Sequence, residues 1–130
     1  RLRACIREVD TVARFGGDEF VIVINELHAD KAHADEYLLE IAEKVRGKIA
    51  EPFNLQSTTM NMKLLIQHRC TASIGCLSFA GKTRQGRDLL KIADKEMYQA
   101  KQLGRNRVCL HQAQQEKAVD TINEAQRSPP

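Results

Sequence analysis

The chain has 130 residues, of which 42% are hydrophobic and 28% are charged, and its net charge is +3. This length allows one domain with a proper core, and the composition is typical of a soluble globular protein. No apolar run is long enough to span a bilayer and no signal-peptide pattern opens the sequence, so we expect no direct membrane contact. The mild positive charge is compatible with an anionic ligand but does not predict a nucleic-acid-binding protein, for which a strong basic stripe is typical.

The four cysteines, Cys5, Cys70, Cys76 and Cys109, form no C-x-x-C pair. Because structural zinc sites need closer spacing or a histidine cluster, a zinc site built on them is not expected. All four stand in apolar or strand-like surroundings, where a free thiol acts as a small hydrophobic side chain. This usage indicates a reducing, cytoplasmic setting.

The first part of the chain predicts a helix followed by a hairpin. Apolar residues recur at helical spacing over residues 2–9, so the sequence starts within a predicted helix. Strands are predicted over residues 11–15 and 19–24, and Gly16-Gly17 between them predicts an antiparallel hairpin.

A second helix is predicted from an N-cap at Asp30 to about Ala50, and Pro52 ends it. Its expected apolar face comprises Leu38, Ile41, Ala42, Val45 and Ile49.

The segment after Pro52 predicts a short strand over residues 53–56 and a polar loop over 57–63. A longer strand is predicted over 64–74, which resumes as residues 76–79 after Gly75. A basic, glycine-containing loop follows over residues 81–86.

The clearest predicted helix covers residues 87–103, with Gly104 as its C-cap. Its expected inward side chains are Leu90, Ala93, Met97 and Ala100. Residues 108–110 predict a last strand, so we expect one domain over residues 1–111 and a polar tail or linker over 112–130. The element order is typical of an α+β fold, an α/β sandwich with helices packed on a mostly antiparallel sheet.

Local chemistry around Gly16-Gly17-Asp18-Glu19 supports two interpretations. The glycines would let a large ligand approach the backbone, and an exposed carboxylate beside them suits Mg²⁺, which binds one or two carboxylates together with phosphate oxygens. Against this, Asp18 and Glu19 would point to opposite faces of a regular strand. From local physics alone, an ordinary turn with solvated acids is the favoured interpretation.

Two further groups of charged residues are equally ambiguous. Lys101 continues one polar face of the last helix, and Arg105 follows just beyond its end; both could hold phosphates, but the helix dipole favours cations there without any ligand. Arg7 and Asp10, three residues apart, could form a weak surface ion pair. Alternatively, the arginine could stack on a purine and pair with its edge.

Three blocks of sequence resolve these alternatives by resemblance. RFGGDEFVIVI, CTASIGCLSF and ADKEMYQAKQLGRNRV occur in this order, and together they resemble the GGDEF family, the diguanylate cyclases that make cyclic di-GMP. The resemblance covers roughly Leu2 to Leu110. It implies a fold like that of nucleotide cyclases, in which helices flank a central sheet and the GGDEF turn forms the active site.

The resemblance also implies a role for each site residue. Asp18 would be a ligand of Mg²⁺ or Mn²⁺, and with Glu19 it would promote deprotonation of the 3′-hydroxyl of GTP. That hydroxyl would attack the α-phosphate of a second GTP held by a second GGDEF domain in a homodimer, with two metal ions neutralising charge. Gly16 and Gly17 would let the nucleotide lie against the backbone.

The remaining matches concern phosphate contacts and inhibition. Lys101 and Arg105 match the lysine and arginine that contact phosphates in the family. Arg7 and Asp10 match its R-x-x-D motif, where cyclic di-GMP binds and inhibits the enzyme. All signature positions are intact, which argues against a degenerate domain that acts only as a receptor.

The sequence departs from the family pattern at its start. Family members carry an upstream strand and helix with a D-x-x-x-F-K-x-x-N-D-like motif, which supplies another metal ligand and the residues that recognise guanine, and nothing here matches it. We therefore expect the C-terminal part of a GGDEF domain, inactive or very weak by itself, with apolar surface exposed beside the absent strand. The alternative function is a non-catalytic module that binds GTP or cyclic di-GMP beside a phosphodiesterase domain.

Overall fold

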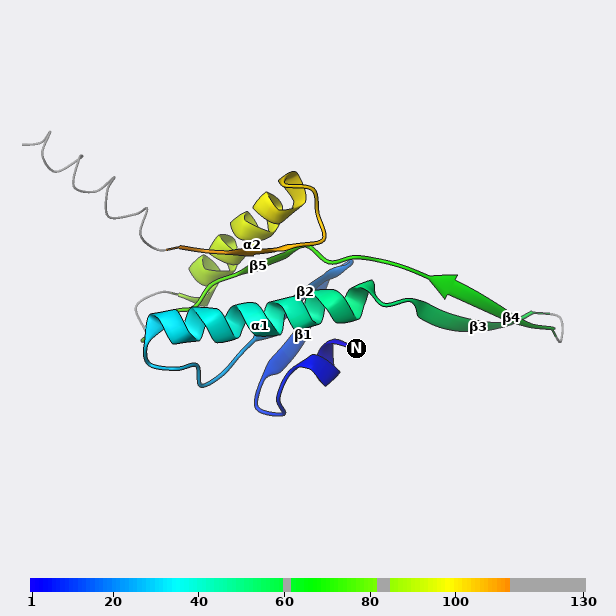
Figure 1. The fold of residues 1–130 in the computed structure, drawn as a ribbon, viewed down its shortest axis with the longest axis horizontal. Helices are drawn as coiled ribbons and strands as arrows, with labels where there is room; N and C mark the ends of the chain where they lie inside the picture. Colours follow the sequence, from blue (N-terminus) through cyan, green and yellow to red (C-terminus); the bar gives the residue numbers. More distant parts are fainter. Residues whose placement is uncertain (60–61, 82–84, 113–130) are drawn as a thin grey trace, which may run out of the picture.

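The structure, a computed structural model, describes residues 1–59, 62–81 and 85–112. Figure 1 shows two helices and a series of short strands, and a two-stranded arm, β3–β4, that extends far from the rest of the chain. Within the described ranges, no helix is both long enough and apolar enough to cross a membrane. The predicted tail over residues 113–130 lies outside the described residues.

The elements follow the predicted order along the chain. They are η1 (Leu2–Cys5), β1 (Thr11–Gly16), β2 (Glu19–Val23), α1 (Lys31–Ala50), β3 (Phe53–Thr59), β4 (Met62–His68), β5 (Ile74–Cys76), α2 (Gly86–Gln102) and β6 (Val108–Leu110).

The predicted helix at the start of the chain is only a short 3₁₀ helix, η1. Ile6, the residue after it, is extended, with φ −122° and ψ 166°. The backbone N–H of Arg7 then donates to the carboxylate of Asp10 at 2.9 Å. Because an aspartate side chain that captures a nearby N–H competes with helical hydrogen bonding, the chain turns here instead of continuing as a helix.

The predicted hairpin is confirmed. β1 and β2 pair antiparallel, from Thr11 opposite Val23 to Gly16 opposite Glu19, with an irregularity in register between Arg14 and Gly16. Gly17 has a φ of +52°, a left-handed conformation that glycine adopts without steric cost.

Helix α1 begins at the predicted N-cap and buries the predicted face. The side chain of Asp30 accepts a hydrogen bond from the N–H of His33 at 3.1 Å, which satisfies one of the unpaired donors in the first turn. Pro52 lies just past the end of this helix, as predicted. The buried residues of α1 are Ala34, Leu38, Ile41, Ala42 and Val45.

The predicted loop over residues 57–63 is wrong at its described residues, because residues 57–59 belong to β3 and residues 62–63 to β4. β3 and β4 pair antiparallel in continuous register from Phe53 opposite His68 to Thr59 opposite Met62. The predicted strand over residues 64–74 is correspondingly divided, since β4 ends at His68 and β5 begins at Ile74. β3 starts with alternating apolar and polar residues over 53–56, but residues 57–59 are all polar, so the sequence predicted a loop where the strand continues.

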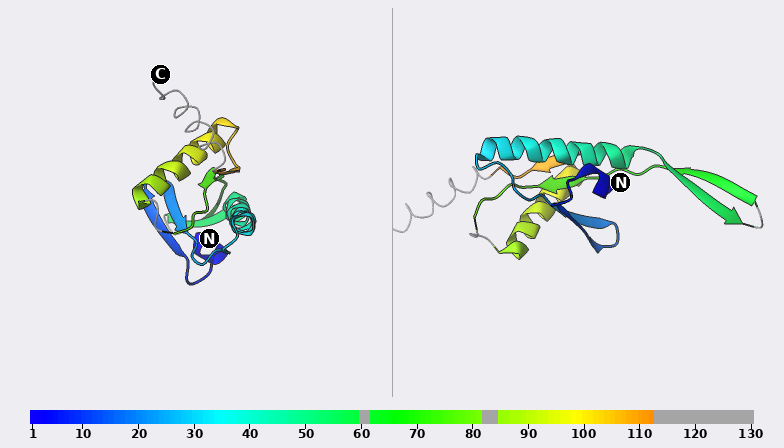
Figure 2. Two further views of the ribbon diagram at one scale, coloured as in Figure 1. Left: turned by 90° about the vertical axis from the view of Figure 1, so that its left-hand side faces the viewer. Right: turned by 90° about the horizontal axis from the view of Figure 1, so that it is seen from below.

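β5 and β6 form a parallel ladder that lies between the two helices and contacts both (Figure 2). A Cβ atom on Gly75 would lie 2.1 Å from the carbonyl oxygen of Ala93 and 2.2 Å from the backbone nitrogen of Met97. β5 therefore packs directly on the backbone of α2. Leu90, predicted to face inward, is 36% exposed, whereas Glu96 on the same helix is only 7% exposed.

The α+β class is confirmed, but the described strands form three separate two-stranded ladders instead of one sheet. The order is β1–β2, β3–β4 and β5–β6, and two of the three pairs are antiparallel. Two apolar clusters join α1 to the β1–β2 and β5–β6 ladders, and neither cluster includes a described residue of the β3–β4 arm. One is centred on Cys5, Ile41 and Val45, and the other on Leu38, Ala42 and Cys76.

The cysteines are free, and their surroundings differ from the prediction at one position. Cys5 and Cys76 are buried and Cys109 is half-buried, whereas Cys70 is exposed. Burial raises the pKa of the Cys76 thiol to about 12, helped by the nearby Asp35, Cys109 and Glu96. The thiols of Cys5 and Cys76 therefore belong to the apolar packing, as predicted, whereas the exposed thiol of Cys70 does not.

Candidate functional site

The turn between β1 and β2 is open to solvent and braced from one side. The guanidinium group of Arg14 donates two hydrogen bonds to the carbonyl oxygen of Gly17, at 2.9 Å from Nε and 2.7 Å from Nη2. A Cβ atom added at Gly16 or Gly17 would meet nothing within 4 Å. The backbone of the turn therefore leaves room for a ligand to lie against it.

The two acids of this turn are exposed and have no partner in the described part of the chain. Asp18 is a turn residue and Glu19 is the first residue of β2. Neither side chain forms a hydrogen bond or an ion pair with any described residue. Hard carboxylate oxygens beside an open backbone are the donor set that Mg²⁺ takes from proteins, so these residues fit that ion.

Arg7 and Asp10 are brought together at the other end of β1. Asp10 is 2% exposed, and its carboxylate accepts from the side chain of Arg7 at 3.3 and 3.4 Å. It also accepts from the backbone N–H of Asn25 at 3.0 Å. The ion pair between Arg7 and Asp10 is therefore present, but its acid does not lie at the surface as expected: Asp10 is buried and joins the turn before β1 to the residues after β2.

The hydrogen bonds around Asp10 also keep it charged. Burial alone would raise the pKa of this carboxyl group, but bonds from the Arg7 side chain and from the backbone of Asn25 and Arg7 hold the pKa below its ordinary value. Asp10 is thus an anchor with its oxygens occupied, and it holds the guanidinium group of Arg7 in place. The Arg7 side chain remains 42% exposed and lies over the ring of Tyr37, 5.8 Å from its centroid.

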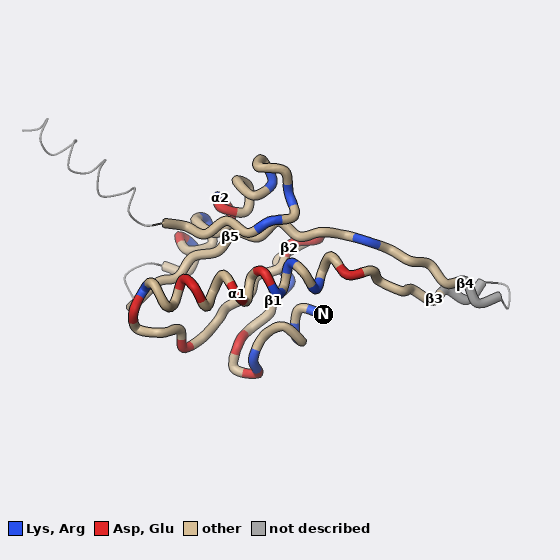
Figure 3. Tube along the Cα trace, viewed as in Figure 1, with Lys and Arg blue, Asp and Glu red and all other residues tan. Residues whose placement is uncertain are grey.

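Lys101 and Arg105 lie at the end of α2 and just beyond it. Gly104 ends the helix with a φ of +111°, and Arg105 follows with a φ of +61°. The N–H of Arg105 bonds to the carbonyl of Ala100 at 3.0 Å, which fixes the turn. Neither cationic side chain pairs with a described residue. Figure 3 shows several Lys and Arg positions, in blue, close together around the end of α2.

The predicted site residues therefore form three groups. The structure unites Arg7 with Asp10, Gly16 to Glu19 in one turn, and Lys101 with Arg105 at one helix end. No hydrogen bond or ion pair between described residues links one group to another.

Sequence reasoning missed two residues that shape the site. Asn25 contributes its N–H to Asp10, its carbonyl to Arg7 and its side-chain amide to the carbonyl of Val9. Arg14 braces the turn. The position of an arginine three residues before a glycine turn could have suggested a brace, but no local pattern marks Asn25, because its role depends on the pairing of β1 with β2.

Comparison with known proteins tests the resemblance directly. A family model described as diguanylate cyclase, GGDEF domain, matches residues 1–107. Diguanylate cyclase A of Treponema denticola is 34% identical over 109 residues, which are 84% of this chain and 26% of that protein. The bifunctional diguanylate cyclase/cyclic di-GMP phosphodiesterase MucR of Pseudomonas aeruginosa is 35% identical over 114 residues, which are 87% of this chain and 14% of that protein.

Solved structures agree with the sequence comparison. The crystal structure of the GGDEF domain of YfiN (TpbB) from Pseudomonas aeruginosa superposes with a TM-score of 0.63 at 29% identity, covering 85% of this chain and 62% of that one. The chain thus spans about a quarter or less of these two curated relatives and under two thirds of the solved domain. The family match, over most of the chain, confirms the resemblance: the chain belongs to the GGDEF family of diguanylate cyclase domains.

Proposed function

We propose that this domain binds GTP at the β1–β2 turn and, facing a second copy, condenses two GTP molecules into cyclic di-GMP. The observation that carries the proposal is the turn itself, where Asp18 and Glu19 are exposed, form no bond with a described residue and stand beside two glycines with open space. Carboxylates left free in this way raise local negative charge without stabilising the fold. Family membership supports their use in catalysis.

Asp18 would hold Mg²⁺ or Mn²⁺ here. When bound, such an ion supplies positive charge to the triphosphate and the attacking oxygen. Glu19, adjacent to it, would accept the proton of the 3′-hydroxyl group, whose oxygen forms a bond to the α-phosphorus of the second GTP as pyrophosphate leaves. Gly16 and Gly17 would let the nucleotide contact the backbone.

Lys101 and Arg105 would bind phosphate oxygens. Both side chains are free of partners in the described residues, so neither has to break an ion pair to bind an anion. A homodimer of such domains is required by the chemistry, because each product molecule needs two nucleotides held face to face.

Arg7 would bind the product and inhibit the enzyme, whereas Asp10 would position it. Since the oxygens of Asp10 are already occupied inside the protein, the ligand contact belongs to the exposed part of the Arg7 guanidinium group. This division of roles predicts that Arg7→Ala weakens product binding and also lowers stability, because the buried carboxylate of Asp10 loses its side-chain partner. Asp10→Ala should weaken product binding indirectly, because it removes the anchor that holds the Arg7 guanidinium group.

The experiment uses the whole protein that carries this domain, because the chain matches only part of its relatives. Incubation with GTP and Mg²⁺ should yield cyclic di-GMP and pyrophosphate, and Asp18→Asn and Glu19→Gln should each reduce the rate at least a hundredfold. Glu40→Gln, an exposed carboxylate on α1, is the matched control and should leave the rate unchanged. A folded dimer that forms no product would contradict the proposal.

The second candidate is a regulatory module without catalysis. It is favoured by the anchored Arg7 group, which is formed independently of the catalytic turn, and by the similarity to a protein that also carries a phosphodiesterase activity. Calorimetry separates the two. A module of this kind would bind cyclic di-GMP in an Arg7-dependent manner while the whole protein makes none from GTP.

A further inference from the structure

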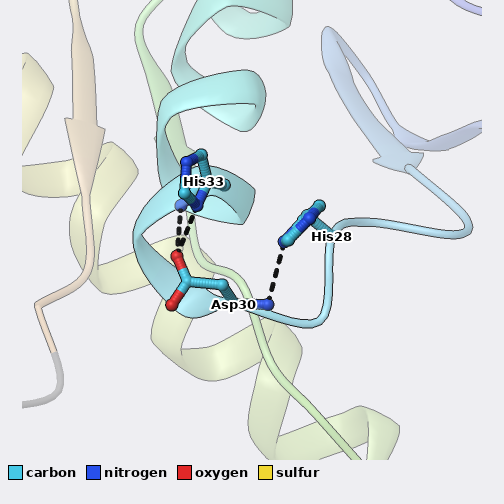
Figure 4. A group of neighbouring side chains, drawn as sticks. All are labelled: His28, Asp30 and His33. Carbon is cyan, nitrogen blue, oxygen red and sulfur yellow. Dashed lines mark hydrogen bonds and ion pairs between the residues drawn. The ribbon is translucent and has the colours of Figure 1, made fainter.

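A cluster of three potential metal ligands lies where the loop after β2 enters α1, away from the proposed nucleotide site. His28, Asp30 and His33 each offer one ligand atom, and these atoms all lie within 4.8 Å of one another. Figure 4 shows the carboxylate of Asp30 beside the ring of His33, with the ring of His28 across the same turn. The two imidazole rings are 5.0 Å apart between centroids and tilted by 50°.

We infer that this cluster binds a divalent transition-metal ion of the zinc type through two imidazoles and one carboxylate. Two histidines with one acid are a ligand set that zinc uses where its fourth position stays open to water. Tetrahedral coordination places neighbouring ligand atoms about 3.3 Å apart. All three residues are exposed, so side-chain rotations can bring the ligand atoms to that spacing. Nδ1 of His28 accepts from the N–H of Asp30 at 3.0 Å, so this ring can keep that bond only if it binds the ion through Nε2.

The carboxylate of Asp30 can cap helix α1 with one oxygen atom and bind the ion with the other. Its Oδ2 atom accepts from the N–H of His33 at 3.1 Å and contacts Nδ1 of the same residue at 2.7 Å. No donor in the described part of the chain bonds to the other oxygen, Oδ1.

The nearest basic side chain does not oppose a cation. Lys31, next to Asp30 in the chain, turns away and pairs with Asp35 at 2.7 Å and with Ser78 at 3.2 Å. The positive end of the helix dipole opposes a cation here, and the three ligands are open to water, so we expect a dissociation constant on the order of a micromolar.

The test is zinc titration of the full chain, produced without a histidine tag and with Cys70→Ser to remove the exposed competing thiol. Calorimetry should show one ion per chain, and His28→Gln or His33→Gln should weaken binding at least tenfold. His68→Gln, an exposed histidine on β4, is the matched control and should bind zinc like the parent. Asp30→Asn should also weaken binding, while circular dichroism shows an intact helix, because asparagine caps as well as aspartate.

Two results would overturn the inference. Absence of saturable binding would show that the cluster is only an N-cap ion pair. Equal affinity in the parent, His28→Gln and His33→Gln proteins would show that the ion binds elsewhere. Melting temperature supplies an independent readout, since saturating zinc should raise it in the parent and not in His28→Gln.

Discussion

The layer formed by α1, α2, β5 and β6 differs sharply from the β1–β2 hairpin in how it is stabilised. In the helical layer, Ala100 is completely buried and Gly75 lies against the backbone of α2. In the hairpin, Phe15 is 67% exposed and Phe20 is 51% exposed, and polar bonds to Asp10 hold its base. Substitutions in the layer should therefore change stability, whereas substitutions at the tip of the hairpin should change function.

The largest effect is expected from Gly75→Ala. The new Cβ atom would lie about 2 Å from two backbone atoms of α2, so β5 and the helix would have to separate. We expect a loss of about 4 kcal/mol or more in the free energy of unfolding, measured by urea denaturation. Gly47→Ala is the control, because this helical glycine has nothing within 4 Å and should gain about 1 kcal/mol. Equal effects of the two substitutions would contradict the close packing of β5.

The reactivity of the Cys76 thiol tests the packing of the same layer without any substitution. Because the pKa of Cys76 is raised from 9.0 to about 12, its thiolate fraction should fall about a thousandfold. Iodoacetamide followed by peptide mass mapping should label the exposed Cys70 quickly and Cys76 only after unfolding. Rapid labelling of Cys76 in the folded protein would show that the layer opens readily.

Asp10→Asn tests the polar base of the hairpin. Oδ1 of Asp10 accepts from Nη2 of Arg7 and from the N–H of Asn25, and Oδ2 accepts from the N–H and Nε of Arg7. In asparagine an amide NH₂ group replaces one of these oxygens, so it would face two N–H donors that lose their acceptor. We expect a loss of about 2 kcal/mol in the free energy of unfolding at pH 7. Glu40→Gln, which removes an exposed carboxylate, should change it by less than about 0.5 kcal/mol.

Acid should reproduce the effect of that substitution. The pKa of Asp10 is lower in the folded protein than its ordinary 3.8, so its contribution is complete above about pH 4 and is lost as the pH falls through the folded pKa. The stability difference between the parent and Asp10→Asn should therefore shrink below pH 4. A difference that stays constant down to pH 2 would exclude a charged Asp10 as its source.

Much of the helical layer was predictable because its signals are local. An N-cap at Asp30 and an apolar stripe define α1, and Gly104 marks the end of α2. The predictions that failed concern residues whose positions depend on contacts between segments distant in sequence. The inward position of Glu96 could not be predicted, because it depends on the ring of His111, which lies 3.0 Å from its carboxylate.

In the candidate site, only the grouping of the β1–β2 turn residues was predictable from the sequence. The glycines and acids of the turn are adjacent in sequence, so their grouping followed from the pattern. The burial of Asp10 did not, because it depends on Asn25, which reaches it only through the pairing of β1 with β2. Sequence alone therefore supplied the candidate site residues but did not predict that Asp10 is a buried anchor.

Asp18→Asn should have the smallest effect on stability. It is the sharpest test of the difference between the helical layer and the tip of the β1–β2 hairpin. Its carboxylate is exposed and forms no bond with a described residue, so we expect less than about 0.5 kcal/mol of change in the free energy of unfolding. Removal of a negative charge next to Glu19 could even stabilise the turn slightly, as is common where charges are gathered for function. Urea denaturation of the two proteins side by side gives the measurement. A loss above 1 kcal/mol would show that Asp18 supports the fold, and the hairpin tip would then be a structural turn as well as a site.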